Sequence, residues 1–289
     1  MRFATIEVNG APTVAIVSSD SQRYWPVEEA LPGFKGDMVD LIRAVPNPQA
    51  TLKTSGEGRP LAGVRILAPI ANPRRNVFLV GKNYHEHAKE FNKSGFDGSK
   101  EDAPPLPSFF TKPASTIVGP NDPVLSHQEA TREVDYENEF TVIIGKGGRG
   151  IKKADAYSHV WGYTIVNDVT ARDLQKQARQ WFLGKALDTF CPMGPFIVTP
   201  DEIDPENVQL KTWINGELRQ NANTGDLIFN IPTIIEVLSA GMALEPGDII
   251  ATGTAAGVGI GFTPPKFLKP GDEMKLEIEG IGTLVNRMQ

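Results

Sequence analysis

The stretch that decides the fold class is Val134-Asp135-Tyr136-Glu137-Asn138-Glu139-Phe140-Thr141-Val142-Ile143-Ile144-Gly145. Apolar residues alternate along it and a β-branched run ends at glycine, a pattern that predicts a β-strand. Because side chains alternate between the two faces of a strand, Glu137 and Glu139 are expected on one face, roughly 7 Å apart. A solvated face would stay polar, but this one continues with Thr141 and Ile143. The two carboxylates are therefore expected at the mouth of a buried region.

Two carboxylates this close repel each other unless a positive charge lies between them. A hard divalent cation with oxygen ligands is the natural partner for such a pair. Asp168 is a third carboxylate of interest, because it lies between a predicted strand at 160–166 and a predicted helix at 171–182. Taken alone, an aspartate at that junction would more often cap the helix.

Length, charge and cysteine content argue against several classes of protein. The 289 residues suffice for one large domain and a small one. The net charge is −6 and no long basic run is present, which disfavours nucleic acid as a partner. No apolar stretch is long enough to span a bilayer, and the N-terminus lacks the core of a signal peptide. Cys191 is the single cysteine and is expected to be a buried thiol, so a cytoplasmic location is expected.

The first 70 residues are predicted to form a small unit. Residues 3–8 and 13–17 predict a hairpin on an Asn9-Gly10 turn. Residues 37–42 predict a short helix. A small N-terminal α+β domain is therefore predicted at residues 1–70.

The remainder of the chain, residues 71–289, consists mostly of short predicted strands separated by turns. A polar, glycine- and proline-containing loop at 91–108 is long for a compact domain, so it is expected to be functional or mobile. The fold class predicted for the chain is β-rich α+β, with a mixed and barrel-like sheet in the larger domain.

Six motifs in a fixed order carry the residues suited to chemistry. They are GKNYHEHAKE (81–90), FTKP (110–113), DYENE (135–139), VNDVTARDLQ (166–175), FLGK (182–185) and ATGTAAG (251–257). This ordered set resembles the fumarylacetoacetate hydrolase superfamily, in its branch of acylpyruvases and 2-oxo acid hydrolase-decarboxylases. The resemblance covers about residues 70–289 and implies the β-rich fold of that family.

The resemblance implies that Glu137, Glu139 and Asp168 bind Mg²⁺ or Mn²⁺. Three carboxylates without a convincing soft ligand also suit a hard, octahedral ion that keeps positions for water and substrate. The resemblance further implies that Lys185 lies near this metal, where it handles protons or holds substrate. A lysine near a cation can have a lowered pKa, which would make it usable as an acid or base.

Three further residues match positions that contact substrate in the family. Arg172 and Gln175 share one face of the predicted helix, and the resemblance directs them at carboxylate and carbonyl oxygens. Thr254 lies in a glycine-containing turn after a strand, where backbone amides can bind an anion. Without the resemblance, a surface arginine and a plain tight turn would be the simpler interpretations.

His87 and Glu90 are three residues apart and match a His-Glu pair that the family carries on a mobile lid. A histidine oriented by a carboxylate can take a proton from water. His85 is the competing choice for this role, two residues earlier.

Together these features imply a metal-dependent hydrolase that cleaves a carbon–carbon bond of a 2,4-dioxo acid, an acylpyruvate or a 2,4-diketo-3-deoxy sugar acid, and releases pyruvate. Oxaloacetate decarboxylation is an alternative, because it passes through the same enolate without an attacking water. Hydratase, isomerase or lyase activity on a 2-oxo diacid and a non-catalytic binding role also stay open. The expected partners are a small 2-oxo acid and, by resemblance, a second copy of the chain in a homodimer, with neither nucleic acid nor membrane.

Overall fold

The computed structural model describes residues 1–93, 105–177 and 180–289. Most of the loop predicted at 91–108 therefore lies outside the described residues. Among the helices that are described, none combines the length and the apolar character needed to cross a membrane.

The N-terminal residues fold around the predicted hairpin, which is confirmed. Strands β1 (Arg2–Val8) and β2 (Ala11–Val17) pair in antiparallel fashion. Asn9 and Gly10 join them with φ angles of 51° and 76°, as a type I′ turn requires. Helix α2 (Met38–Ala44) begins at Asp37, whose side chain accepts a hydrogen bond from the Asp40 amide. The other elements here are β3 (Arg23–Pro26), α1 (Val27–Ala30), α3 (Pro48–Thr51), β4 (Arg59–Pro60) and β5 (Ile66–Leu67).

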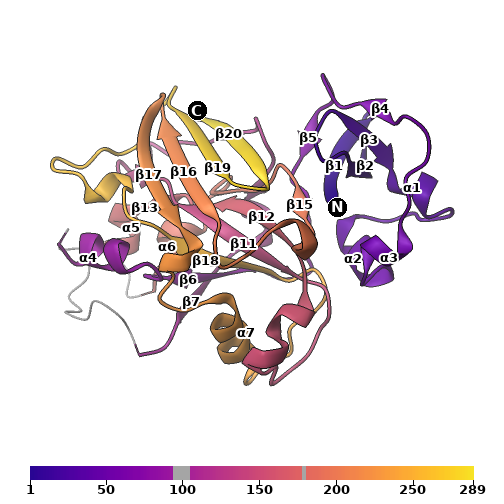
Figure 1. Ribbon diagram of the computed structural model, residues 1–289. Helices are drawn as coiled ribbons and strands as arrows, with labels where there is room; N and C mark the ends of the chain where they lie inside the picture. Colours follow the sequence, from indigo (N-terminus) through magenta and orange to yellow (C-terminus); the bar gives the residue numbers. More distant parts are fainter. Residues whose placement is uncertain (94–104, 178–179) are drawn as a thin grey trace.

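A large mixed sheet runs through the whole molecule (Figure 1). Its order is β4-β3-β2-β1-β15-β12-β11-β18-β6-β7, with β5 beside β1. Its central and C-terminal members are β15 (Ile197–Val198), β12 (Val160–Asn167), β11 (Asn138–Ile144), β18 (Ile249–Thr254), β6 (Val77–Gly81) and β7 (Ser108–Lys112). The pair β18–β6 is parallel, whereas the other pairs along this order are antiparallel. The predicted β-rich α+β class with a mixed sheet is confirmed. The described end strands, β4 and β7, do not pair with each other, so this sheet does not close into a barrel.

A second sheet stands against the first, above it in Figure 1. Its strands, in order, are β17 (Glu217–Asn223), β16 (Gln209–Ile214), β19 (Glu273–Ile278), β20 (Gly282–Met288) and β9 (Pro123–Val124). Apolar side chains of both sheets form one core, in which the rings of Phe140 and Tyr163 stack with centroids 4.8 Å apart. Burial of such a core is the main driving force for folding.

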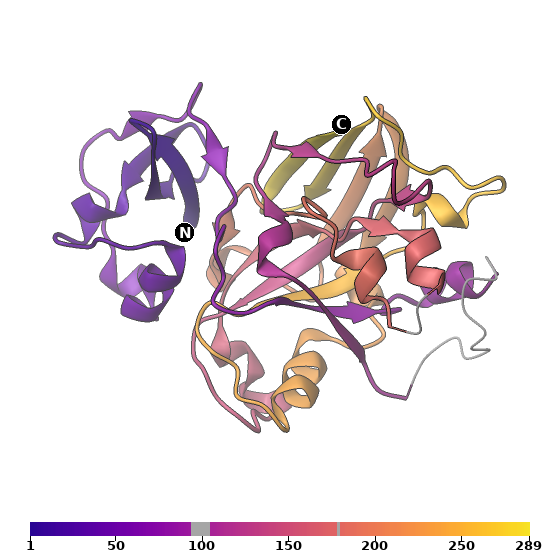
Figure 2. The same ribbon diagram turned by 180° about the vertical axis from the view of Figure 1, so that it is seen from behind.

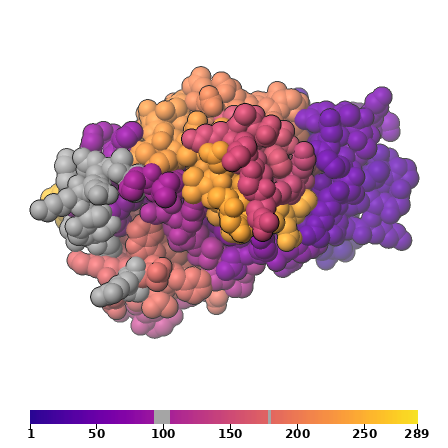
Figure 3. Space-filling model, turned by 90° about the horizontal axis from the view of Figure 1, so that it is seen from below, coloured from indigo at the N-terminus to yellow at the C-terminus, as the bar shows by residue number. Residues whose placement is uncertain are grey.

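Short helices cover the edges of these sheets. On the lower face, α7 (Ile231–Ser239) packs against η2 (Lys153–His159), and the N-terminal residues form one end of the molecule (Figures 2 and 3). The remaining elements are η1 (Ala114–Thr116), β8 (Ile117–Val118), α4 (His85–Lys93), β10 (Val134–Asp135), β13 (Thr170–Ala171), α5 (Arg172–Gln177), α6 (Phe182–Lys185), β14 (Cys191–Pro192), η3 (Pro200–Glu202), η4 (Thr224–Asp226) and η5 (Gly259–Gly261).

The prediction of one continuous strand from Val134 to Gly145 is wrong. The segment forms two strands, β10 paired with β13 and β11 paired with both β12 and β18. Tyr136 and Glu137 lie between them, where the chain changes partners. All seven residues of β11 are buried, because the strand is central in its sheet.

The prediction of one helix over 171–182 is also wrong. Helix α5 ends at Gln177, residues 178–179 lie outside the described part, and α6 begins at Phe182. The two helices pack closely at Gly184, where a Cβ atom would lie only 2.7 Å from the backbone nitrogen of Gln175 on α5. A contact this close requires a residue without a side chain.

Candidate active site

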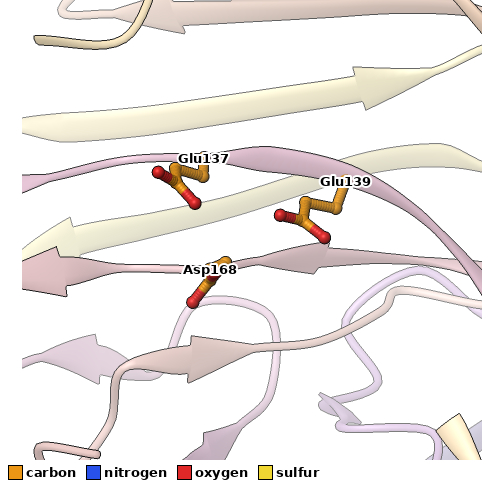
Figure 4. A group of neighbouring side chains, drawn as sticks. All are labelled: Glu137, Glu139 and Asp168. Carbon is orange, nitrogen blue, oxygen red and sulfur yellow. The ribbon is translucent and has the colours of Figure 1, made fainter. Parts of the chain in front are cut away.

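Three carboxylates meet at the centre of the large sheet. Glu139 lies on β11, Glu137 immediately before it, and Asp168 immediately after β12. One oxygen from each lies within 4.8 Å of the others, and Figure 4 shows the three side chains near one another. Their exposed fractions are 5%, 1% and 0% for Glu137, Glu139 and Asp168. Both glutamates therefore face the same cluster, as their i, i+2 spacing in the sequence predicts.

Three buried cations surround the carboxylates. Lys185 Nζ lies 2.8 Å from Glu137 Oε2 and 2.5 Å from Asp168 Oδ2. Lys112 Nζ lies 2.6 Å from the other oxygen of Asp168 and donates to the carbonyl oxygen of Val169. The network therefore holds both oxygens of Asp168 by ion pairs with lysines.

Arg172 closes the network on the other side. Its Nη2 lies 2.7 Å from Glu137 Oε1, and its Nε donates to Asp135 Oδ2 at 2.9 Å. Asp135 also accepts from the amides of Gly259 and Ile260. Arg172 is thus fixed by two carboxylates at the edge of the cluster.

The cations act unequally on the carboxylates. Burial would raise the pKa of Glu137, but Lys185 and Arg172 hold that pKa well below its usual range. Burial, with Asp168 and Glu137 nearby, raises the pKa of Glu139 well above its usual range. Burial lowers the pKa of Lys185, yet the Asp168 and Glu137 carboxylates outweigh it and raise that pKa. The carboxylate cluster therefore raises the pKa of Lys185, whereas a lowered pKa was expected for a lysine near a metal cation.

Glu139 differs from the other two carboxylates in its contacts. Among the described residues its hydrogen-bond donor is the Gly253 amide, at 2.9 Å, and no cationic side chain contacts it. Gly253 has φ 100°, and a Cβ atom there would lie 2.9 Å from the Val80 carbonyl oxygen, so the close approach of this amide requires glycine. Three carboxylates that each offer a hard oxygen donor within 4.8 Å of the others fit a divalent metal ion.

The predicted His-Glu pair lies on α4. His87 is 4% exposed, and its Nδ1 lies 3.3 Å from Glu90 Oε2. Glu90 is itself held by the Gly257 amide, at 3.0 Å. His85, the competing choice, is exposed.

One cavity joins His87 to Glu137 and Glu139. It is lined by Val80, Gly81, Lys82, His87, Phe91, Phe110, Glu137, Glu139, Arg172, Gln175, Trp181, Lys185 and Thr254. Its volume is about 20 Å³, room for about one water molecule. Trp181 packs edge-on against Phe110 and Phe91, with ring centroids 5.4 and 6.4 Å away. A substrate of several carbons therefore enters only if part of this aromatic wall moves.

The three predicted substrate-binding residues all line the cavity. Arg172 Nη1 donates to Gln175 Oε1 at 3.2 Å, so the two share a helix face as expected. Thr254 is the last residue of β18 rather than a residue of the turn after it. Its hydroxyl donates to the Asn138 carbonyl oxygen and accepts from the Gln220 amide, so both functions of this hydroxyl are used within the protein.

Sequence reasoning assigned no role to three residues of this region. Lys112 and Asp135 stand in two of the six motifs, but their ion-pair partners, Asp168 and Arg172, are 56 and 37 residues away along the chain. The one usable signal for Lys112 was a lysine that directly follows an apolar strand and precedes proline. Lys82 stands in the first of the six motifs, before α4, and lines the cavity.

Comparisons with known proteins agree on the family of the chain. A family model described as fumarylacetoacetate (FAA) hydrolase C-terminal matches residues 76–289. Oxaloacetate tautomerase YisK of Bacillus subtilis (strain 168) is 54% identical over 229 residues, which are 79% of this chain and 74% of the relative. A solved structure of a fumarylacetoacetate hydrolase from psychrophilic Exiguobacterium antarcticum is 40% identical, with a TM-score of 0.86 over 100% of this chain and 99% of that one.

A 5-carboxymethyl-2-hydroxymuconate delta-isomerase structure from Mycobacterium smegmatis is 34% identical, with a TM-score of 0.77 over 100% of this chain and 99% of that one. The names of these three relatives describe a tautomerase, a hydrolase and an isomerase. The similarity therefore fixes the family but not the reaction.

Proposed function

The chain belongs to the fumarylacetoacetate hydrolase family, and from that premise we propose that it converts a short 2-oxo dicarboxylate of the oxaloacetate type between its enol and keto forms. The observation that carries the proposal is the single cavity lined by Glu137, Glu139, Lys185 and His87. The relative named as an oxaloacetate tautomerase supports this choice of substrate.

Interconversion of the two forms moves one proton between C3 and the oxygen on C2. When the C3–H bond breaks, its electron pair forms the C2–C3 double bond, and the carbonyl π pair moves onto the oxygen, which takes up a proton. Neither an oxidant nor water is consumed. The site therefore needs a base near C3 and positive charge near the oxygen.

His87 is the base in this proposal. It is buried, it lines the cavity, and Glu90 orients its ring through Nδ1. Lys185 supplies the positive charge, because the carboxylates that hold its Nζ keep it an ammonium group. A divalent cation bound by the three carboxylates would polarise the 2-oxo group.

Arg172 and Gln175 are placed to hold the C1 carboxylate in this proposal. Both line the cavity, and both are almost fully buried. A guanidinium group suits the recognition of a planar carboxylate. Asp135 and Glu137 fix the Arg172 side chain before any ligand binds, so its orientation costs little on binding.

Hydrolysis of an acylpyruvate is the second candidate, and the His87–Glu90 pair favours it. In that reaction the pair would take a proton from water, whose oxygen attacks the 4-carbonyl; the C3–C4 bond would then break, leaving a pyruvate enolate and a carboxylic acid. The same cavity would stabilise the enolate. A relative named as a fumarylacetoacetate hydrolase supports this chemistry.

Three assays on one metal-depleted preparation test the proposal. They measure the loss of enol-oxaloacetate absorbance, pyruvate release from oxaloacetate, and pyruvate release from acetylpyruvate, each with and without added Mg²⁺ or Mn²⁺. We expect the metal to accelerate the first reaction most. His87→Asn should slow it at least tenfold, because general-base catalysis contributes about 10²–10⁴-fold; His85→Asn, on the same helix but exposed, is the matched control.

Faster acetylpyruvate cleavage than tautomerisation would assign the chain to the hydrolase alternative instead. An enzyme that stays fully active after metal removal would contradict both. Loss of activity in His85→Asn equal to that in His87→Asn would overturn the assignment of the base.

A further inference from the structure

Lys82 occupies a backbone position that residues other than glycine seldom adopt. Its φ angle is 53°, in the left-handed region. The next residue, Asn83, fixes this turn: its side chain donates to the carbonyl oxygens of Phe229 and Thr252 and accepts from the Phe229 amide. A lysine held in such a conformation at the wall of a cavity points to a function for its side chain.

The sheet places Lys82 two strands away from Glu139. In the order β11-β18-β6, Glu139 pairs with Thr254 at the end of β18, and β18 runs parallel to β6, which directly precedes Lys82. Neighbouring strands are about 4.8 Å apart, so these two backbones are separated by about 10 Å. A four-carbon diacid and the four-carbon stem of a lysine together span that distance.

The cations at the metal end of the cavity already face carboxylates. Arg172 pairs with two of them, and so does Lys185. Lys82 Nζ donates to the Asn92 amide oxygen at 3.3 Å and lies 5.2 Å from the centre of the Phe91 ring.

We infer that Lys82 binds the distal carboxylate of the substrate and so selects dicarboxylates over 2-oxo monocarboxylates. The inference rests on the proposed function, since the other end of the substrate is held at the carboxylate cluster. Hydrogen bonds between an ammonium and a carboxylate are stronger than neutral ones. Their loss changes affinity by about tenfold to a hundredfold.

The test measures binding, so that it does not depend on which reaction the enzyme catalyses. Malate and 2-hydroxybutanoate have the same four-carbon skeleton and differ in the distal carboxylate. Their dissociation constants are measured by calorimetry on the Mn²⁺-loaded wild type and on Lys82→Met, Lys82→Arg and Lys89→Met. Lys89 is exposed on α4 and does not line the cavity, so it is the matched control.

We expect the wild type, Lys82→Arg and Lys89→Met to prefer malate, and Lys82→Met to lose at least tenfold of that preference. A wild type without preference, or a Lys82→Met variant that keeps it, overturns the inference. A wild type that prefers malate but does not tautomerise oxaloacetate contradicts the proposed function and leaves the role of Lys82 standing.

Lys82→Gly separates this role from a structural one. Glycine adopts positive φ without strain, so the melting temperature of this variant should not fall below that of the wild type, while the preference for malate is lost. A lower melting temperature with the preference retained would show that Lys82 serves the fold and would overturn the inference.

Discussion

Replacing Glu139 by glutamine should stabilise the metal-free protein while it removes metal binding. The three carboxylate oxygens of the cluster lie within 4.8 Å of one another. Two unit charges at that distance repel by about 3.5 kcal/mol at an effective dielectric constant of 20. Lys185 offsets part of this repulsion, and so does proton uptake by Glu139, whose pKa is raised.

We therefore expect Glu139→Gln to raise the free energy of unfolding of the metal-free protein by about 1–3 kcal/mol. The neutral amide keeps an oxygen that accepts the Gly253 N–H, and its NH₂ group can donate to a neighbouring carboxylate. The assay is urea unfolding after chelation, with Glu86→Gln as control. Glu86 is exposed, so its replacement should change stability by less than about 0.5 kcal/mol.

Metal addition gives the second half of the test. At free Mn²⁺ 100-fold above its dissociation constant, binding should stabilise the wild type by about 2.7 kcal/mol. Glu139→Gln should show no such gain, since it lacks one charged ligand. A metal-free variant less stable than the wild type would refute the electrostatic reasoning, and a variant that is still stabilised by Mn²⁺ would refute the assignment of Glu139 as a ligand.

Two further substitutions test other parts of the structure. Lys112→Met removes one partner of a fully buried ion pair with Asp168, so it should cost about 3–5 kcal/mol in urea unfolding; a loss below about 1 kcal/mol would contradict the pairing. Asp37→Ala removes the cap of α2 and should cost about 1 kcal/mol. Arg74 and the Asp40 amide outweigh burial and hold the pKa of Asp37 below its ordinary value, so this stability is present above the unfolded-state pKa and is lost as the pH falls through the folded-state pKa. The Asp37→Ala difference should therefore shrink in strong acid, and one that persists there would contradict the role of the charge.

Local spacing was enough to predict the parts of the site that lie close in the chain. Glu137 and Glu139 are two residues apart beside a strand, and His87 and Glu90 are three apart on a helix. In each pair the periodicity of the backbone brings the side chains together. The same reasoning predicted the hairpin on Asn9-Gly10, because both residues tolerate positive φ.

Sequence spacing failed where the chain turns back on itself. Arg172 and Lys185 would lie about 20 Å apart along one straight helix, yet both contact Glu137. Helix α6 packs closely against α5 at Gly184, a tertiary contact that periodicity does not contain. For the same reason no local pattern connects Lys112 with Asp168, which meet only once the sheet that contains both β7 and β12 has formed.

The residues of the site fall into two groups that lie on different elements, and this division offers an explanation for the variety of reactions in the family. The groups that would stabilise an enolate are Lys185 and a cation held by the three carboxylates. Glu137, Asp168 and Lys185 are buried and are held by ion pairs, and Glu139 is held by the Gly253 amide. The groups that would move the proton or bind the far end of the substrate, His87, Glu90 and Lys82, all belong to the segment between β6 and the end of α4. Changes in that one segment can therefore alter the proton acceptor or the far end of the substrate while the enolate chemistry stays intact. On this reasoning, hydrolysis, isomerisation and tautomerisation need no separate cores, and the selectivity of this chain is to be sought in Lys82 and its neighbours on α4.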